Sequence, residues 1–125
     1  MAGYPRFTLT ATTISSPEPR RLGHFYARLL EWPVVTDTGG WVVLANPDGG
    51  AGLSFHDEPA YEAPVWPGRA GVPQMQSHLD IEVDDLEFGV ACAVALGATV
   101  AQEQPQDGVK VCLDPDGHPF CLFVR

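Results

Sequence analysis

The chain has 125 residues, of which 45% are hydrophobic and 18% are charged, a balance typical of one globular domain. Its formal net charge of −9 argues against nucleic acid as a partner, because phosphate binding requires a basic face. No stretch approaches the roughly 18 consecutive apolar residues of a membrane span, so we expect no membrane association.

The first residues and the cysteines indicate a cytoplasmic protein. Residues 1–10 lack a basic segment followed by an apolar run, so we expect no signal peptide. Cys92, Cys112 and Cys121 are odd in number and show no CxxC spacing. Reduced, mostly buried thiols are therefore the expectation.

A strand, a helix and a strand–turn–strand segment are predicted first along the chain. Residues 7–14 form a β-like run, and residues 15–18 predict a helix start with a hydroxyl cap and Glu18 at N3. The helix ends near Pro33 and carries an apolar stripe formed by Leu22, Phe25, Tyr26, Leu29 and Leu30. Two further strands and the turn between them follow at residues 41–45, 51–56 and 46–49.

The same series of elements recurs later in the chain. Residues 78–83 predict a strand, and residues 84–87 predict a helix start with a carboxylate cap and Glu87 at N3. This helix ends at Gly97 and has an apolar stripe formed by Leu86, Val90, Ala93 and Val94. The closing strands and turn are expected at residues 109–113, 119–124 and 114–117. The second turn reads Asp-Pro-Asp-Gly where the first reads Asn-Pro-Asp-Gly.

Residues 57–73 are rich in proline and glycine and predict a linker without regular structure. Residues 1–56 and 74–125 are then two βαβββ modules. Neither half could bury a core alone, so we expect one α+β domain over residues 1–125.

Paired βαβββ modules with this turn resemble the vicinal oxygen chelate superfamily, which includes glyoxalase I, extradiol dioxygenases and bleomycin-resistance proteins. The similarity spans nearly the whole chain and is greatest to a small glyoxalase-like branch, through residues 25–26, 29–32, 66–68, 78–81 and 114–121. It implies that the curved mixed sheets of the two modules form a cup. In metal-dependent members, the cup holds a divalent ion through the first and last strands of each module, usually with His, Gln or Glu.

Those four positions map to Leu9, Leu53, His78 and Cys121 in this sequence. Leucine cannot donate an electron pair to a metal, and the sequence neighbours of both leucines are not usual ligands either. We therefore expect no metal and no other cofactor.

Strand alternation predicts how the cup is lined. If His78 points inward, Asp80 and Glu82 point the same way. The other expected lining residues are Cys121, Phe123, Leu9, Leu53, Phe55 and Trp66. Counting across the second turn places Lys110 opposite Cys121, where it could stabilise a thiolate, although a small apolar lining residue is the simpler interpretation.

Three interpretations of this lining stay open. The carboxylates could have structural partners, the cleft could bind a cationic, aromatic small molecule, or His78 could act as a general base or acid. We expect a metal-free small-molecule-binding protein that sequesters a cationic or aromatic ligand, as bleomycin-resistance proteins do. The alternative is a glyoxalase-like lyase, isomerase or dioxygenase with an altered site. The resemblance also allows a homodimer, since some drug-binding relatives form their clefts across one.

Overall fold

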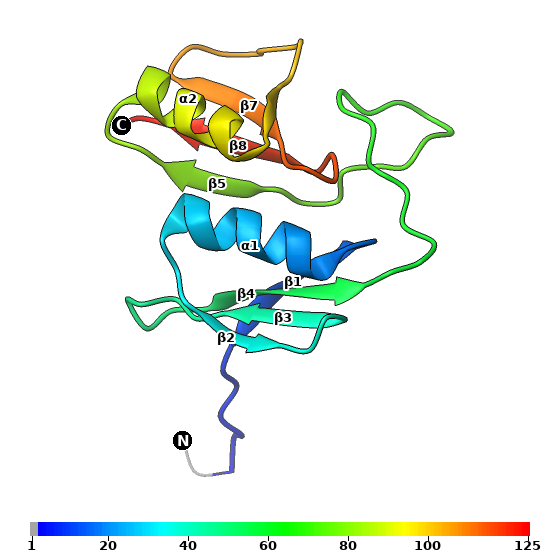
Figure 1. The fold of residues 1–125 in the computed structure, drawn as a ribbon, viewed down its shortest axis with the longest axis vertical. Helices are drawn as coiled ribbons and strands as arrows, with labels where there is room; N and C mark the ends of the chain where they lie inside the picture. The colour runs from blue at the N-terminus through cyan, green and yellow to red at the C-terminus, as the bar shows by residue number, and fades with distance from the viewer. Residues whose placement is uncertain (1–2) are drawn as a thin grey trace.

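The computed structural model describes residues 3–125 and contains two βαβββ modules (Figure 1). Module 1 consists of β1 (Ala11–Ser16), α1 (Pro19–Leu30), β2 (Val34–Asp37), β3 (Trp41–Leu44) and β4 (Gly52–Asp57). Module 2 consists of β5 (Leu79–Glu82), α2 (Leu86–Leu96), β6 (Thr99–Val100), β7 (Val109–Leu113) and β8 (Pro119–Phe123). The predicted α+β fold with two tandem modules is confirmed.

Each module forms its own four-stranded mixed sheet with the same topology. The strand orders are β1-β4-β3-β2 and β5-β8-β7-β6. In both sheets the first strand pairs in parallel with the last strand, and the remaining pairs are antiparallel. The first strand of each module therefore lies at a sheet edge, which leaves β1 and β5 to border the space between the modules.

Helix α1 joins the two modules through the hydrophobic core. The ring of Tyr26 stacks on Phe55 of β4 at a centroid distance of 5.7 Å and meets Phe120 of β8 edge-on at 5.9 Å. Phe25 also packs against Phe120, at 6.0 Å. Burying a large apolar side chain contributes roughly 1.5–3 kcal/mol to the stability of the folded state. These contacts therefore make α1 the main connection between the two modules.

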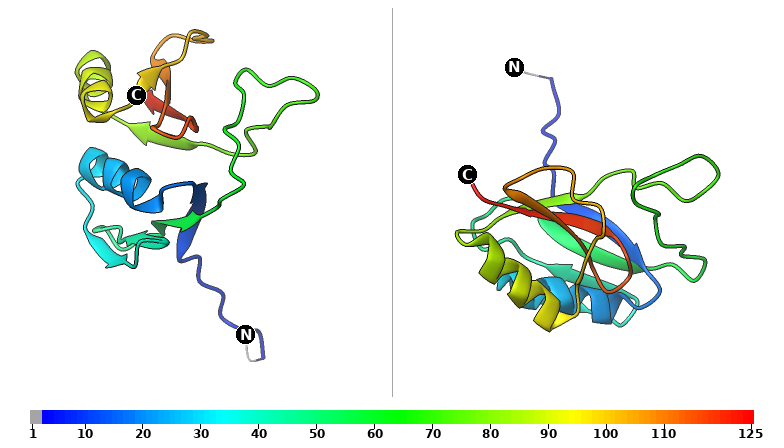
Figure 2. Two further views of the ribbon diagram at one scale, coloured as in Figure 1. Left: turned by 45° about the vertical axis from the view of Figure 1, so that its right-hand side comes forward. Right: turned by 90° about the horizontal axis from the view of Figure 1, so that it is seen from above.

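The two helices lie side by side in both views of Figure 2. Helix α2 is much less buried than α1. Ala93 is the one residue of α2 that is fully buried. Within residues 3–125, no helix is long and apolar enough to cross a membrane.

The first strand differs from its predicted extent. Residues 7–14 were expected, whereas β1 covers Ala11–Ser16. The reason is its partner: β4 pairs with β1 from Gly52, opposite Ala11, to Asp57, opposite Ser16. Residues 7–9 precede this register and have no strand to pair with in the described part of the chain.

Both helix starts also differ from prediction. Helix α1 begins at Pro19, with Glu18 as an N-cap residue that forms no side-chain cap, and the Ser16 hydroxyl instead accepts the Glu18 N–H at 2.9 Å. Helix α2 is capped by Asp85, whose carboxylate accepts the Phe88 N–H at 3.0 Å. Neither helix therefore has the predicted capping box.

Candidate functional site

A cleft of about 510 Å³ lies between the two modules. Strand β1 forms one wall through residues 12–15, and His78 and Leu79 at the start of β5 form the other. The linker closes one side with residues 61–62 and 64, and module 2 adds residues 74–77, which precede β5, and residues 118–119. Its volume falls in the range of roughly 300–1,000 Å³ that small-molecule sites occupy.

The cleft borders on a buried carboxylate, Asp114, which is 4% exposed. One oxygen of Asp114 accepts the backbone N–H groups of Asp116 and His118, each at 3.0 Å. The other oxygen accepts the Tyr26 hydroxyl at 2.7 Å. Because several donors surround this carboxylate, its charge is well stabilised despite its burial.

His118 connects Asp114 to the first module. Its Nδ1 lies 2.9 Å from both oxygens of Asp114, and its Nε2 lies 3.0 Å from the carbonyl oxygen of Ser15. Through these contacts His118 ties β1 to the turn of module 2.

A second aspartate of the same turn contacts both α1 and the linker. The buried side chain of Asp116 accepts the Ser16 hydroxyl and forms an ion pair with Arg21. The backbone carbonyl of Asp116 accepts the Tyr61 hydroxyl at 2.8 Å. The turn at residues 114–117 thus holds β1, α1 and the linker together around one end of the cleft.

Two tyrosines of the cleft stay protonated at neutral pH. Burial, followed by the Asp114 carboxylate, raises the pKa of Tyr26 well above its ordinary value of 10.0. Burial and the carboxylates of Asp114 and Asp116 likewise raise the pKa of Tyr61. Both hydroxyls therefore act as hydrogen-bond donors, and neither is suited to act as a base.

His78 lies directly before β5 and lines the cleft. Its Nε2 is 3.0 Å from an oxygen of Asp80, whose side chain is 62% exposed and lies outside the cleft lining. The two side chains therefore form a partly solvated pair beside the cleft.

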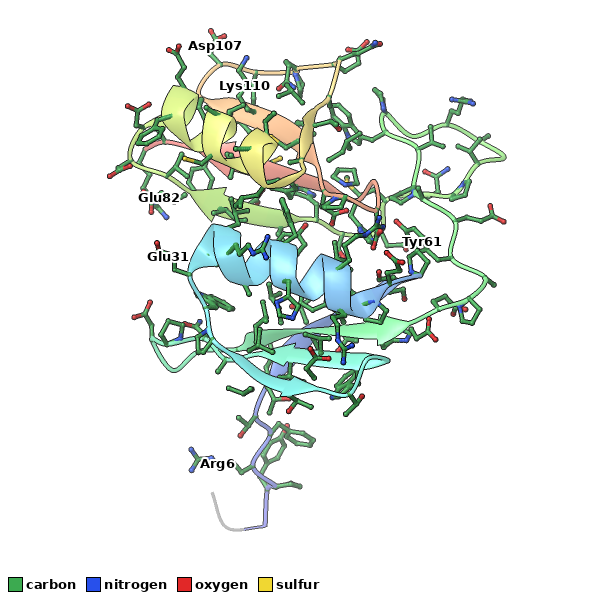
Figure 3. The ribbon with its side chains drawn as sticks, viewed as in Figure 1. Arg6, Glu31, Tyr61, Glu82, Asp107 and Lys110 are labelled. Atoms are coloured by element: carbon green, nitrogen blue, oxygen red, sulfur yellow. The ribbon has the colours of Figure 1, made fainter. Side chains whose placement is uncertain are left out.

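The remaining residues predicted from module 2 lie away from the cleft. Glu82 forms an ion pair with Arg125 at 3.0 Å, and the same guanidinium lies 5.8 Å from the centre of the Phe123 ring. Figure 3 shows Glu82 and Tyr61 on opposite sides of the molecule. Trp66 is half-buried in the linker and does not line the cleft. Tyr61, the other aromatic residue of the linker, does line the cleft.

The residues predicted from module 1 do not line this cleft. Leu53 and Phe55 face α1 in the hydrophobic core, and Leu9 lies before β1 with 79% of its surface exposed. Leu9 precedes β1, which begins at Ala11. For Leu53 and Phe55 the physical reason is a longer hairpin loop. Eight residues separate the paired Leu44 and Leu53 of module 1, whereas seven separate the equivalent Cys112 and Phe120 of module 2.

Because of this extra residue, each residue of β4 that corresponds to a residue of β8 lies one position later in the chain than a count from the turn glycine gives. Val43 pairs with Ser54 as Val111 pairs with Cys121, so the module 1 equivalent of Cys121 is Ser54. Ser54 in turn pairs with Thr13, as Cys121 pairs with Asp80. Counting back two residues from Thr13 gives Ala11 as the equivalent of His78.

The predicted neighbour of Cys121 is also wrong. Val111 lies opposite Cys121, and Lys110 lies opposite Leu122, because the hairpin loop has five residues where four were assumed. Burial, followed by the Asp80 carboxylate, raises the pKa of the Cys121 thiol. The surroundings of Cys121 therefore disfavour the thiolate that a lysine would have stabilised.

The divalent ion implied by the resemblance can be tested against these positions. His78, Asp80 and Cys121 each offer a ligand atom, and these atoms lie within 4.8 Å of one another. The module 1 positions carry Ala11 and Ser54, which provide a methyl group and a hydroxyl group. A four-donor site that spans both modules is therefore incomplete, and these residues do not fit the ion that the superfamily holds.

The sequence did not reveal the residues that shape the cleft most. The sequence pattern predicts no role for His118, and the turn motif predicts only a backbone turn for Asp114 and Asp116. A signal was present, because two carboxylates and an imidazole lie within five residues between two apolar strands. Such groups are buried only where donors compensate them, but the sequence does not say which donors.

Comparisons with known proteins agree with this architecture. A solved glyoxalase/bleomycin resistance protein/dioxygenase family enzyme from Burkholderia phytofirmans PsJN is 19% identical, with a TM-score of 0.71 over 94% of this chain and 98% of that one. A glyoxalase/bleomycin resistance protein from Albidiferax ferrireducens T118 is 18% identical, with a TM-score of 0.65 over 93% and 97% of the two chains.

A glyoxalase family protein from Enterococcus faecalis is 20% identical, with a TM-score of 0.65 over 90% of this chain and 94% of that one. No curated protein sequence matches the chain. The family model described as a glyoxalase-like domain matches residues 11–123, which is nearly the whole length. The chain therefore belongs to the glyoxalase-like domain family, within the vicinal oxygen chelate superfamily.

Proposed function

We propose that this protein binds a neutral, aromatic small molecule in the cleft between its modules. The observation that carries the proposal is the composition of the cleft. Hydroxyl and amide groups of Thr12, Thr13, Ser15 and Gln74 lie next to apolar groups of Ile14, Leu79, Met75 and Pro64. Hydrogen-bonding groups around an apolar floor are typical of sites that orient a flat organic ligand.

The charge of the ligand follows from the carboxylates. A cationic ligand was expected because Asp80 and Glu82 were predicted to line the cup, but both are paired, with His78 and Arg125. Glu62 is the one carboxylate in the described lining, which contains no Lys or Arg. A neutral ligand therefore suits this cleft better than a cation or an anion does.

Matched aromatic probes test this proposal by thermal shift, since a ligand of the folded state raises stability by mass action. We expect benzamide to raise the Tm more than benzyltrimethylammonium or benzoate at the same concentration. Thr13→Trp should remove the shift by filling the cleft from β1. Thr99→Trp, an exposed strand position outside the cleft, is the matched control and should keep it.

Two results would contradict the proposal. A larger shift with the cation would restore the earlier expectation of a cationic ligand. Equal shifts in wild type and Thr13→Trp would place the binding elsewhere.

We also propose that the protein works without a metal ion. The proposal is supported by the incomplete four-donor set and by the raised pKa of the Cys121 thiol, since a cysteine must lose its proton to bind a metal. Metal analysis of protein purified without chelator or histidine tag should find no stoichiometric metal. A tightly held ion that is lost in Cys121→Ser would contradict this.

A second candidate function is a metal-free lyase or isomerase. It is favoured by one observation, the position of His78 in the cleft wall with Asp80 3.0 Å from its Nε2. A carboxylate at one ring nitrogen can orient the imidazole and leave the other nitrogen for proton transfer. His78→Gln should then abolish turnover of a bound substrate while it retains binding, whereas a pure binding protein would show no turnover in either form.

We further propose a cytoplasmic location, which the three free thiols support. We also predict a homodimer, which sedimentation tests. We predict no binding to nucleic acid, which a mobility-shift assay tests.

A further inference from the structure

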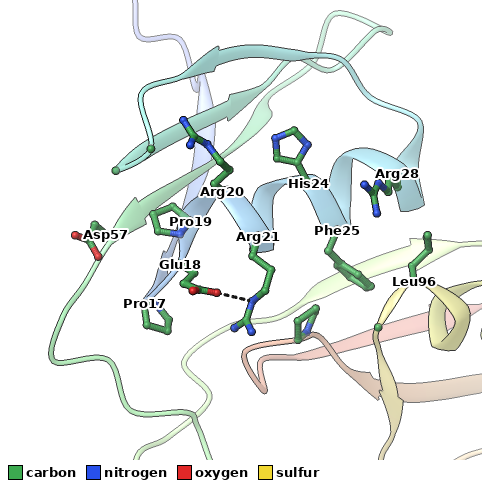
Figure 4. A pocket seen from close by; sticks show the side chains of 14 residues that line it. Pro17, Glu18, Pro19, Arg20, Arg21, His24, Phe25, Arg28, Asp57 and Leu96 are labelled. Atoms are coloured by element: carbon green, nitrogen blue, oxygen red, sulfur yellow. Dashed lines mark ion pairs between the residues drawn. The ribbon is translucent and has the colours of Figure 1, made fainter.

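A second and larger groove, of about 830 Å³, runs along the outer surface of α1 (Figure 4). The carboxylates of Glu18 and Asp57 line it, and it brings together four residues of α1: Arg20, Arg21, His24 and Arg28. At 100° per residue these four positions fall within an arc of about 100° on the helix. They are all of the charged or ionisable side chains of α1 apart from Tyr26, and none of them is acidic. Three of the seven Lys and Arg residues of the chain therefore gather in this groove.

Much of the hydrogen-bonding capacity of these guanidinium groups is unused. Arg20 contacts Asp37 through Nε alone, at 2.9 and 3.0 Å, which leaves its two terminal NH₂ groups for another acceptor. Arg21 uses Nε toward Glu18 and one terminal nitrogen toward Asp116. Arg28 has no side-chain hydrogen bond or ion pair to any part of the chain that the structure describes. Each guanidinium offers five N–H donors, so the groove has many left.

Fold stability accounts for Arg21, which pairs with the buried Asp116, but not for the other two arginines beside it. Arg20 and Arg21 lie in the first turn of α1, where the helix dipole favours acidic rather than basic side chains. The Arg20–Asp37 pair is exposed, and such pairs contribute only about 0–1 kcal/mol. The carboxylates of Asp37, Glu18 and Asp116 nevertheless hold Arg20 and Arg21 in place, which lowers the entropy cost of binding a further acceptor.

We propose that this groove binds a small organic molecule with two or more anionic groups. Figure 4 shows Arg20 and Arg21 directed to different sides of α1, with Arg28 further along the helix. A single anionic group could not meet all three, whereas a polycarboxylate or an organic diphosphate lying along α1 could. The apolar lining comes from both modules: Pro17, Pro19 and Phe25 of module 1, and Leu96 and Pro115 of module 2. This site is separate from the cleft between the modules, so evidence against one proposal leaves the other unaffected.

Titration of the full chain with citrate and with inorganic pyrophosphate, followed by amide NMR shifts, tests the site. We expect saturable binding of at least one of the two, with shifts in α1 and at residues 39–40 and 96–97. Acetate, with one anionic group, should bind far more weakly. A preference for citrate or for pyrophosphate distinguishes a carboxylate ligand from a phosphate ligand.

Arg28→Gln is the decisive variant, because this exposed side chain has no partner whose loss would disturb the fold. It should weaken binding about tenfold, the effect of losing one charge-assisted contact. Arg69→Gln, an exposed linker arginine outside the groove, is the matched control and should bind as wild type does. The proposal is wrong if neither anion saturates, if Arg28→Gln binds as tightly as wild type, or if Arg69→Gln weakens binding equally.

Discussion

The two hairpin turns of this protein have nearly the same sequence but very different surroundings. In the first turn, the Asn46 side chain accepts the Asp48 N–H at 2.9 Å and donates weakly to the Ala51 carbonyl at 3.4 Å. In the second turn, Asp114 accepts the Asp116 N–H in the same way, at 3.0 Å. Asp114 is also bonded to Tyr26 of the other module and to His118.

The difference shows how a repeated element can acquire a second role. Both turns use their first side chain to fix the local backbone, so the sequence repeat survives. Only the second turn is buried between the modules, where its charge can be compensated by distant donors. The predictions below test this division of roles by changing equivalent positions of the two turns or groups that only the second turn binds.

The largest effect is expected at Asp114. Asp114→Ala would leave His118, Tyr26 and two backbone N–H groups without their acceptor, at a cost of about 3–5 kcal/mol in the free energy of unfolding. Asn46→Ala in the first turn should cost about 1 kcal/mol or less. Urea denaturation measures both. Equal losses would mean that the second turn has no special role.

The next largest effect is expected at His118. His118→Phe keeps an aromatic ring near Tyr61, 5.1 Å away in the wild type, but removes the bonds to Asp114 and Ser15. We expect a loss of about 1–3 kcal/mol. The control is His24→Phe, which removes only an exposed contact to Asp37 at 3.4 Å and should change stability by about 0.5 kcal/mol or less. If His118→Phe lowers the free energy of unfolding no more than His24→Phe does, His118 does not stabilise the contact between the modules.

A smaller effect, with a distinctive pH dependence, is expected at Tyr26. Tyr26→Phe removes the hydroxyl that donates to Asp114 and should cost about 1 kcal/mol near neutral pH. In the wild type, the folded state keeps the Tyr26 proton above pH 10.0, where an unfolded tyrosine releases it. Stability is therefore complete below that pH and falls as the pH rises toward the folded pKa.

Tyr26→Phe should show a shallower alkaline loss of stability than the wild type, as measured by denaturation at several pH values above 10.0. An identical alkaline slope in both proteins would mean that Tyr26 ionises as easily in the folded state as in the unfolded state.

An effect as small as that of Tyr26→Phe is expected at the third turn position. Asp116→Asn retains an acceptor for Ser16 but loses the charge that faces Arg21, so we expect a cost of about 1 kcal/mol. Asp48→Asn, at the equivalent exposed position, should be within about 0.5 kcal/mol of wild type. Thermal denaturation compares the two, and a reversed order would contradict the burial difference between the turns.

Local signals in the sequence predicted the modules well. Proline, glycine and capping residues mark turns and helix ends through backbone preferences that act over a few residues, so the helices and hairpins were found. Strands β2 and β6 were not located, since four and two residues give no usable alternation. The extent of β1 was misjudged because its limits depend on β4, some 40 residues away.

The site was harder to predict because it depends on register and on long-range partners. One extra residue in the first hairpin moves Leu53 from the expected cleft to the core, since neighbouring strand residues face opposite sides of a sheet. The bond between His118 and Ser15 joins residues 103 positions apart. His78 does lie at the wall of this cleft, since it directly precedes β5 in the same module, where no insertion intervenes.

The most direct test of the central claim, that the cleft between the modules is the ligand site, is an NMR screen of neutral aromatic fragments against the labelled full chain. Signals that shift on binding should come from Thr12, Ser15, Tyr61 and Ser77, on both walls and in the linker. Fragments that shift only signals outside this set, or a screen without any binding fragment, would contradict the claim.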